Sequence, residues 1–112
     1  MQFLVYGLDP MTENSTPPSP EMMAELGKFT EEAIKAGILI ATGGLKPTGT
    51  RLRLANGKVT VTDGPFIEAK ELIAGFAVIK VNSLEEAIEW TRRFREIIGD
   101  GESEIVPIVG PE

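Results

Sequence analysis

The sequence predicts an α+β domain in which an antiparallel sheet carries two helices on one face. Three observations support this prediction: two amphipathic helical patterns, several short runs of strand-forming residues, and an order in which strands flank each helix. A length of 112 residues is typical of one domain, spanning 1–112, and is too short for two. The content of 42% hydrophobic and 25% charged residues is that of an ordinary globular protein.

The first half of the chain is predicted to contain a strand, a helix and a second strand. Residues 2–6 form a short apolar run, and the proline-rich stretch after it is too polar for a regular element. Ser19 and Pro20 are a typical helix cap and first helical residue, so we expect a helix from there to Gly37. Its apolar stripe comprises Met22, Leu26, Phe29 and Ala33. Residues 38–41 are then the second strand.

A hairpin is predicted in the middle of the chain. Residues 51–54 and 58–61 alternate between polar and apolar on either side of Asn56-Gly57, the strongest short hairpin signal. The second of these strands leads directly to Asp63. The acidic stretch 63–71 is therefore expected to start at the end of a rigid strand.

The last third of the chain is predicted to contain a central strand, a helix and an edge strand. Residues 75–81 are an almost unbroken apolar run, as in a strand buried on both faces. Ser83 and Glu86 predict a capping box at the start of the second helix. Pro107 predicts that the final strand, residues 104–108, is either an edge strand or a point of exchange. The apolar face of the second helix comprises Leu84, Ala87, Ile88, Thr91, Phe94 and Ile98. Trp90 lies towards the edge of this face, where completing the core is favoured over facing a partner.

This order of elements is that of a ferredoxin-like βαββ(β)αβ domain, with both helices on one face of the sheet. The other face is then uncovered. Residues 38–41 and 76–81 are apolar on both sides, so the open face would expose a hydrophobic patch. A homodimer through the open sheet face is therefore predicted.

Composition disfavours several classes of function. A net charge of −6 repels nucleic acids and anionic membranes, so neither partner is expected. The chain has no cysteine and no histidine, which excludes disulfides, thiolate catalysis and imidazole acid–base chemistry. The arginines at 92, 93 and 95 lie beside Glu89 and Glu96 in a helical pattern, which indicates a solvated face.

Residues 1–6 lack the features of a signal peptide, and no run approaches about 18 apolar residues. A cytoplasmic location is therefore expected. No cofactor and no metal are predicted: Asp63, Glu68 and Glu71 supply oxygen ligands suited to Mg²⁺ or Ca²⁺, but no spaced binding loop accompanies them.

A motif inside the acidic stretch resembles a known family. Asp63-Gly64-Pro65-Phe66, followed by Glu68, Lys70-Glu71 and Gly75-Phe76, is similar to the signature of the YCII-related proteins of the DGPF branch. The resemblance covers nearly the whole chain, and further matching stretches are 3–6, 36–37, 44–47, Arg53, 84–87 and 104–107. It implies a dimeric α+β barrel with a pocket near the acidic turn. Members of the wider group carry a His–Asp pair for acid–base chemistry, of which only the Asp half is present here, at Asp63.

Two roles are open for Asp63. As a turn residue, its carboxylate would accept the backbone N–H of Phe66. As a catalytic residue, it would be a general base in a partly dry pocket, beside Glu68 and Glu71. The candidate substrate-binding residues are Arg53, Phe66, Glu68, Lys70 and Glu71. Of these, Lys70 or Arg53 would bind an anionic or enolate-like oxygen of the substrate.

Three classes of function follow from this reasoning. The first is a small-molecule lyase or isomerase with Asp63 as general base, acting on a small anionic or phenolic compound. The second is a ligand-binding or regulatory dimer that performs no chemistry. The third is an interaction protein whose function is dimerisation itself.

Overall fold

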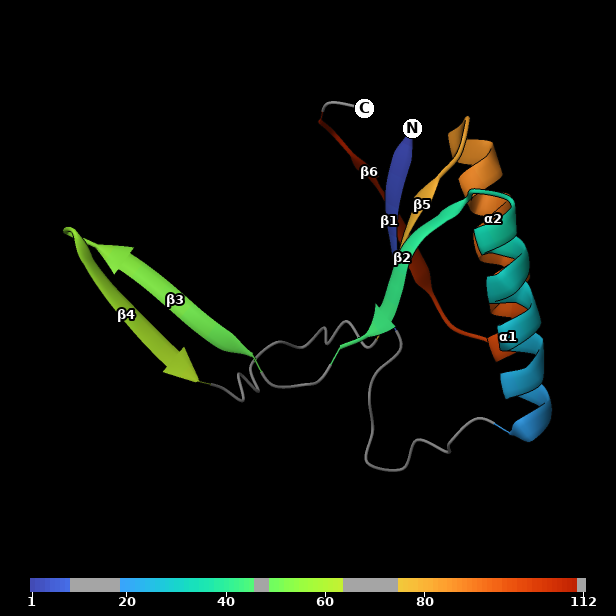
Figure 1. Cartoon of the computed structure of the whole chain (residues 1–112), viewed down its shortest axis with the longest axis horizontal. Coiled ribbons are helices and arrows are strands. Elements are labelled where there is room, and N and C mark those ends of the chain that lie inside the picture. The colour runs from blue at the N-terminus through green and yellow to red at the C-terminus, as the bar shows by residue number, and fades with distance from the viewer. Residues whose placement is uncertain (9–18, 46–48, 64–74, 111–112) are drawn as a thin grey trace.

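The computed structural model describes residues 1–8, 19–45, 49–63 and 75–110, and their elements follow the predicted order (Figure 1). In chain order these elements are β1 (Gln2–Gly7), α1 (Pro20–Lys35), β2 (Leu39–Gly44), β3 (Thr50–Ala55), β4 (Lys58–Asp63), β5 (Gly75–Lys80), α2 (Leu84–Ile98) and β6 (Ser103–Ile108).

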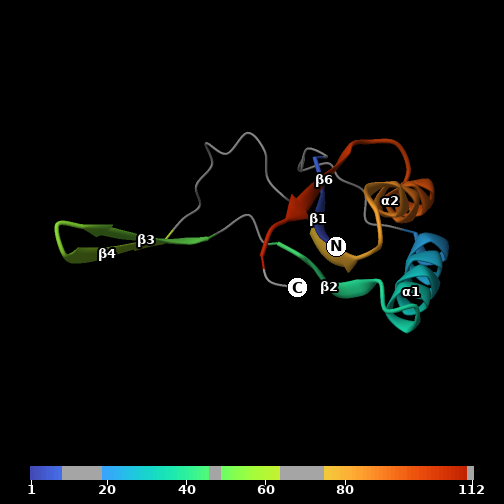
Figure 2. The same ribbon diagram turned by 90° about the horizontal axis from the view of Figure 1, so that it is seen from above.

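Four strands form one antiparallel sheet in the order β2-β5-β1-β6. Both helices cover the same face of this sheet (Figure 2). The α+β, ferredoxin-like fold is therefore confirmed. As predicted, β5 is central and β6, with Pro107, lies at an edge. We call these four strands and two helices the body of the protein.

The core of the body lies between the sheet and the helices. Along β1 the burial alternates: Phe3 is 1% exposed, whereas the neighbouring Leu4 is half-buried. Ile79 of β5 and Ala87 of α2 complete the centre of the core, at 6% and 0% exposed. The side of the sheet that faces the helices is therefore buried at its centre, whereas the opposite side is partly exposed in the single chain.

The open sheet face is apolar at its centre. Leu4 lies opposite Val78 of β5 and Val106 of β6, and all three side chains are half-buried. Phe76, the next residue of β5 on this face, is also half-buried. Residues 75–81 were predicted to be buried on both sides. They are buried mainly on the side that faces the helices, and their other side is only partly buried in the single chain.

The predicted helix ends are present, with one difference. The Ser19 hydroxyl accepts a backbone N–H of the first turn of α1 at 3.1 Å, and Gly37 has a φ of +73° just after that helix. The Ser83 hydroxyl accepts the Glu86 N–H at 3.1 Å. The Glu86 carboxylate, however, accepts the N–H of Asn82 at 3.0 Å, one residue before the capping residue.

The buried face of α2 is rotated from the predicted one. Leu84 and Ile88 are 45% and 48% exposed, although both were expected in the core. Trp90, as expected, packs against the core, and its ring centroid lies 5.6 Å from that of Phe29 on α1. Contact with the neighbouring helix therefore turns the apolar stripe of α2 towards α1.

The hairpin formed by β3 and β4 stands apart from the body in both views (Figures 1 and 2). Within the described residues its strands pair only with each other, as a separate two-stranded sheet. The predicted Asn56-Gly57 turn is confirmed by φ values of +51° and +73°. We call residues 50–63 the hairpin arm.

Candidate functional site

A pocket of about 150 Å³ lies at the end of the sheet where β1 and β2 finish and β5 and β6 begin. We call it the sheet-end pocket. Gly75 is one of its lining residues and directly follows residues 64–74, which hold most of the acidic stretch and lie outside the described residues. The segment that carries the family-like motif therefore joins the body at this pocket.

Two glycines, Gly43 and Gly75, line the pocket beside each other, and a Cβ atom at either position would make ordinary van der Waals contacts. Gly43 of β2 lies opposite Phe76 of β5, and a Cβ atom on Gly43 would lie 3.4 Å from the phenyl ring. A Cβ atom on Gly75 would lie 3.6 Å from the Gly43 carbonyl oxygen. The Thr42 hydroxyl donates to the Phe76 carbonyl oxygen at 2.9 Å, which fixes β2 against β5 beside the pocket.

The lining of the pocket is apolar with a few hydroxyl groups. Val5, Ala77 and Phe94 contribute apolar surface, and the side-chain hydroxyls among the lining residues are those of Tyr6, Thr42 and Ser103. Among the described residues that line this pocket, none carries a charge. A cavity of about 150 Å³ with apolar walls is large enough for a benzene ring.

A second cavity, of about 80 Å³, lies between the sheet and the two helices. It shares Val5, Thr42, Ala77 and Phe94 with the sheet-end pocket, so the two cavities are neighbours. Trp90 and Phe29 also line this second cavity.

Asp63 is one of the two predicted site residues that lie within the described part of the chain; the other is Arg53. Asp63 ends β4, is exposed, and accepts a hydrogen bond from the Thr50 hydroxyl at 3.0 Å. This contact joins the two strands at the base of the hairpin arm. The predicted contact of Asp63 with the Phe66 N–H falls outside the described residues.

Arg53 lies on the opposite face of the hairpin arm from Asp63. Asp63 pairs with Thr50, and Arg53 pairs with Thr60, three residues along each strand. Because side chains alternate along a strand, an odd separation places them on opposite faces. The structure thus does not bring these two candidates together within one chain, and strand alternation in the sequence already contained this information.

The face of the arm that carries Arg53 is polar and basic. It forms an open groove of about 390 Å³ whose lining residues are Arg51, Arg53, Ala55, Lys58, Thr60 and Thr62. The remaining candidates for substrate binding, Phe66, Glu68, Lys70 and Glu71, lie outside the described residues. Within the parts of the chain that the structure describes, no three acidic, histidine or cysteine side chains gather as a metal site would require.

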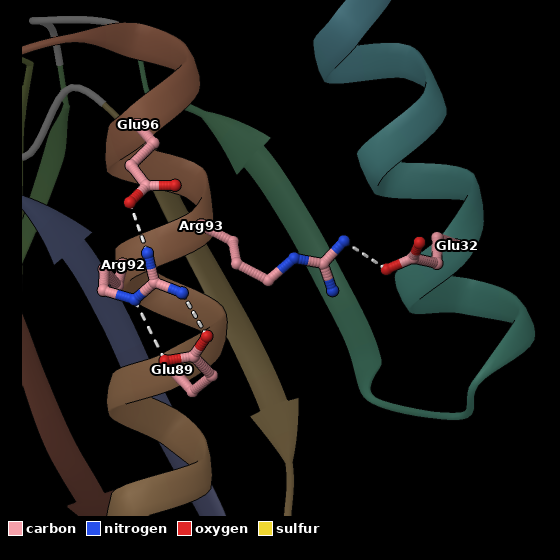
Figure 3. Close-up of polar contacts among 5 residues, drawn as sticks. All are labelled: Glu32, Glu89, Arg92, Arg93 and Glu96. Carbon is pink, nitrogen blue, oxygen red and sulfur yellow. Dashed lines mark hydrogen bonds and ion pairs between the residues drawn. The ribbon is translucent and has the colours of Figure 1, made fainter.

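The predicted solvated face of α2 is confirmed for Arg92 (Figure 3), whereas Arg93 and Arg95 are half-buried. The Arg92 guanidinium donates to the carboxylates of Glu89 and Glu96, one helical turn to either side. The hydrogen bond from Arg92 lowers the pKa of Glu89 below its usual value, and the same contact raises the pKa of Arg92. These pairs are exposed, so they contribute little to stability.

Arg93 has a role that the sequence did not reveal, because it links the two helices. Its guanidinium lies 2.5 Å from the Glu32 carboxylate of α1 (Figure 3). It also lies over two aromatic rings, 5.1 Å from the centroid of Phe29 and 4.7 Å from that of Trp90. A helical pattern identifies Arg93 as solvent-facing but contains no information about which helix packs beside it.

Within the described residues, neither helix has the length and apolar character needed to cross a membrane. Comparison with known proteins finds an uncharacterized protein of Rhizobium meliloti (strain 1021) that is 37% identical over 73 residues. The matched stretch covers 63% of this chain and 59% of the relative, so the chain spans about three-fifths of the length of that protein. A match to the family model of the YCII-related domain extends over residues 1–110. The chain therefore belongs to the YCII-related domain family.

Proposed function

We propose that the protein is a homodimer that binds a small ring compound in the sheet-end pocket. The observation that carries this proposal is the pocket itself: about 150 Å³ with apolar walls, at the point where the motif segment joins the sheet. Ligand sites are commonly concave, mostly apolar and equipped with a few polar groups that orient the ligand. The sheet-end pocket has these properties.

The lining favours a phenolic compound over a highly charged one. An aromatic ring would contact Val5, Ala77 and Phe94, and its hydroxyl would exchange hydrogen bonds with Thr42 or Ser103. A multiply charged ligand would lose its hydration without gaining a countercharge from the described lining. A single carboxylate would need a cation such as Lys70, from the motif segment.

The homodimer is supported by the apolar centre of the open sheet face, where Leu4, Val78 and Val106 are half-buried. A second copy that covers this face would remove these side chains from water. The proposal treats residues 1–112 as one domain and places the protein in the cytoplasm.

A lyase or isomerase activity with Asp63 as general base is the second candidate. It is favoured by the position of this carboxylate, which is exposed at the end of a strand and tied to the pocket rim at Gly75 by the motif segment. The Thr50 hydroxyl would fix the orientation of the carboxylate, while Phe66, Glu68, Lys70 and Glu71 would contact the substrate. Arg53 lies on the face of the arm opposite to Asp63, so it would contact the substrate only if its side chain reached around the arm.

The binding proposal is tested by thermal shift with phenol, benzoate and salicylate. Ala77 lines the pocket, so Ala77→Val should fill part of it and reduce the ligand-induced rise in Tm. Ala55→Val is the matched control, because Ala55 also lies on a strand but in the hairpin arm, away from this pocket. Equal ligand responses in the two variants would place the ligand elsewhere.

The second candidate is separated from the first by Asp63→Asn. A general base contributes roughly 10²–10⁴-fold to a rate, so the variant should lose turnover at that level while ligand-induced stabilisation survives. Thr50→Val removes the hydrogen-bond donor alone and serves as the control for a structural role of Asp63. If Asp63→Asn and Thr50→Val give the same modest loss, Asp63 is a structural residue of the arm.

A further inference from the structure

The hairpin arm presents an apolar face that its own chain leaves exposed. The exposed fractions are 65% for Leu52, 67% for Leu54, 55% for Val59 and 59% for Val61. These four side chains lie on one face, because Leu52 pairs with Val61 and Leu54 pairs with Val59. The arm is therefore amphipathic, with this aliphatic face opposite the basic groove.

An arm of this kind is not expected to be stable in isolation. A two-stranded hairpin is at best marginally stable in water, and it normally needs a further layer against its apolar side. The described body does not provide that layer, since the arm points away from the sheet and helices (Figures 1 and 2). The radius of gyration is 16.5 Å, whereas a compact chain of this length has about 13 Å.

We propose that the apolar face of each hairpin arm packs on the open sheet face of a second copy of the chain. This inference rests on the homodimer of the proposed function and adds which segment crosses between the copies. The two apolar surfaces are matched in kind: aliphatic side chains on the arm, and Leu4, Val78 and Val106 on the sheet. Both are built from strands of six residues, about 20 Å long.

Charge complementarity favours a second copy as the occupant. The arm carries three cations and one carboxylate, a net charge of +2, which leaves −8 for the rest of a chain whose total is −6. An arm that reaches over another copy is thus attracted to it over a long range. Packing by the aliphatic face would leave Arg53 and Lys58 pointing outward, where they remain solvated.

The exchange makes the interface isologous, because each copy gives one arm and receives one. The dimer then contains two equivalent contacts. In each contact, the arm of one copy covers the open sheet face of the other. Asp63 lies on the aliphatic face, beside Thr50, so each copy would bring this carboxylate to the sheet of its partner.

Sedimentation velocity of two matched variants tests the proposal. Val61→Lys places a charge on the aliphatic face of the arm, whereas Thr60→Lys places the same charge one residue away on the groove face. We expect wild type and Thr60→Lys to be dimers and Val61→Lys to raise the dimer dissociation constant by roughly tenfold or more. Far-UV circular dichroism and Tm of each variant show whether the body remains folded.

The results that would contradict the arm exchange differ from those that would contradict the proposed function. A wild-type dimer that Val61→Lys leaves unchanged would overturn the arm exchange while the homodimer stands. A wild-type monomer would overturn the exchange and the dimer together, whereas the ligand response of the sheet-end pocket would still be measurable. Val78→Lys, on the open sheet face, should weaken the dimer as strongly as Val61→Lys.

Crosslinking separates exchange from an arm that folds onto its own sheet. The chain has no native cysteine, so Leu54→Cys with Val78→Cys gives the only two thiols. A bismaleimide spanning about 10 Å, the usual spacing of packed sheets, should then produce a covalent dimer on a denaturing gel. A product that migrates as a monomer with both thiols consumed, or no crosslink at all, would overturn the proposal.

Discussion

The body and the hairpin arm contain strands of the same length and similar alternation, yet they bury their apolar residues to opposite extents. Phe3 of β1 is 1% exposed, whereas Leu54 of β3 is 67% exposed. In the body, two helices lie against the apolar face of the sheet, and in the arm no described element of the same chain does so. Alternation therefore defines the two faces of a strand but not what covers them.

This difference separates two kinds of stabilisation. Core side chains of the body contribute to the free energy of unfolding of a single chain, at any protein concentration. In the proposed dimer, the aliphatic side chains of the arm would contribute to the free energy of association, which depends on concentration. A substitution in the core of the body should therefore change the free energy of unfolding of the single chain. A substitution on the aliphatic face of the arm should change the free energy of association instead.

The largest expected effect is that of Phe3→Ala in the body. Removing a fully buried phenyl ring should lower the free energy of unfolding by about 3–5 kcal/mol. Urea denaturation at several protein concentrations measures this loss. Leu54→Ala is the control in the arm and should change the unfolding of the isolated chain by about 0.5 kcal/mol or less. A comparable loss in both variants would mean that the arm belongs to the same core.

An intermediate effect comes from two glycines in the same conformation. Gly37 ends α1 and Gly57 lies at the tip of the arm, both have a φ of +73°, and neither Cβ position has a neighbour within 4 Å. Alanine in this left-handed conformation costs about 1–2 kcal/mol. Gly37→Ala should lower the free energy of unfolding of the body by this amount, as measured by urea denaturation.

Gly57→Ala should instead strain only the arm. In dilute solution the unfolding of the body should be unchanged, while the dimer dissociation constant, measured by sedimentation, should rise by up to roughly tenfold. Equal destabilisation by Gly37→Ala and Gly57→Ala in dilute solution would contradict the separation between arm and body.

The smallest expected effect concerns the exposed ion pairs of α2. The pKa of Glu89 is lowered by its hydrogen bond from Arg92, so its folded pKa lies below its unfolded one. The stabilisation is then complete above about pH 4.5 and is lost as the pH falls through the folded pKa. Glu89→Gln should lower Tm by about 2 °C or less at pH 7 and have less effect near pH 3. A larger difference at pH 3 than at pH 7 would reverse this sign.

Much of the fold could be predicted from local patterns. Ser19, Gly37 and Ser83 mark helix ends through their own backbone chemistry, and the Asn56-Gly57 turn depends only on two adjacent residues. These features hold because each is decided within a few residues. The face of α2 was predicted less well, since contact of Trp90 with Phe29 on another helix decides its rotation.

The candidate site was predicted only in part. Asp63 was correctly placed at a strand end, and its Thr50 partner follows from the register of the hairpin. The separation of Arg53 from Asp63 also follows from that register but was not deduced. The sheet-end pocket could not be predicted, because it depends on how Gly43, Phe76 and Phe94 come together from three different elements.

The two edges of the main sheet have a consequence for polymerisation. At one edge, Pro107 of β6 has no backbone N–H to offer to an incoming strand. At the other, the pairing of β2 with β5 shifts register between Leu39 and Ala41, which makes that edge irregular. Neither edge is a regular template for endless strand addition. Strand addition at the main sheet is therefore disfavoured, so the proposed dimer would not extend through this sheet into fibres.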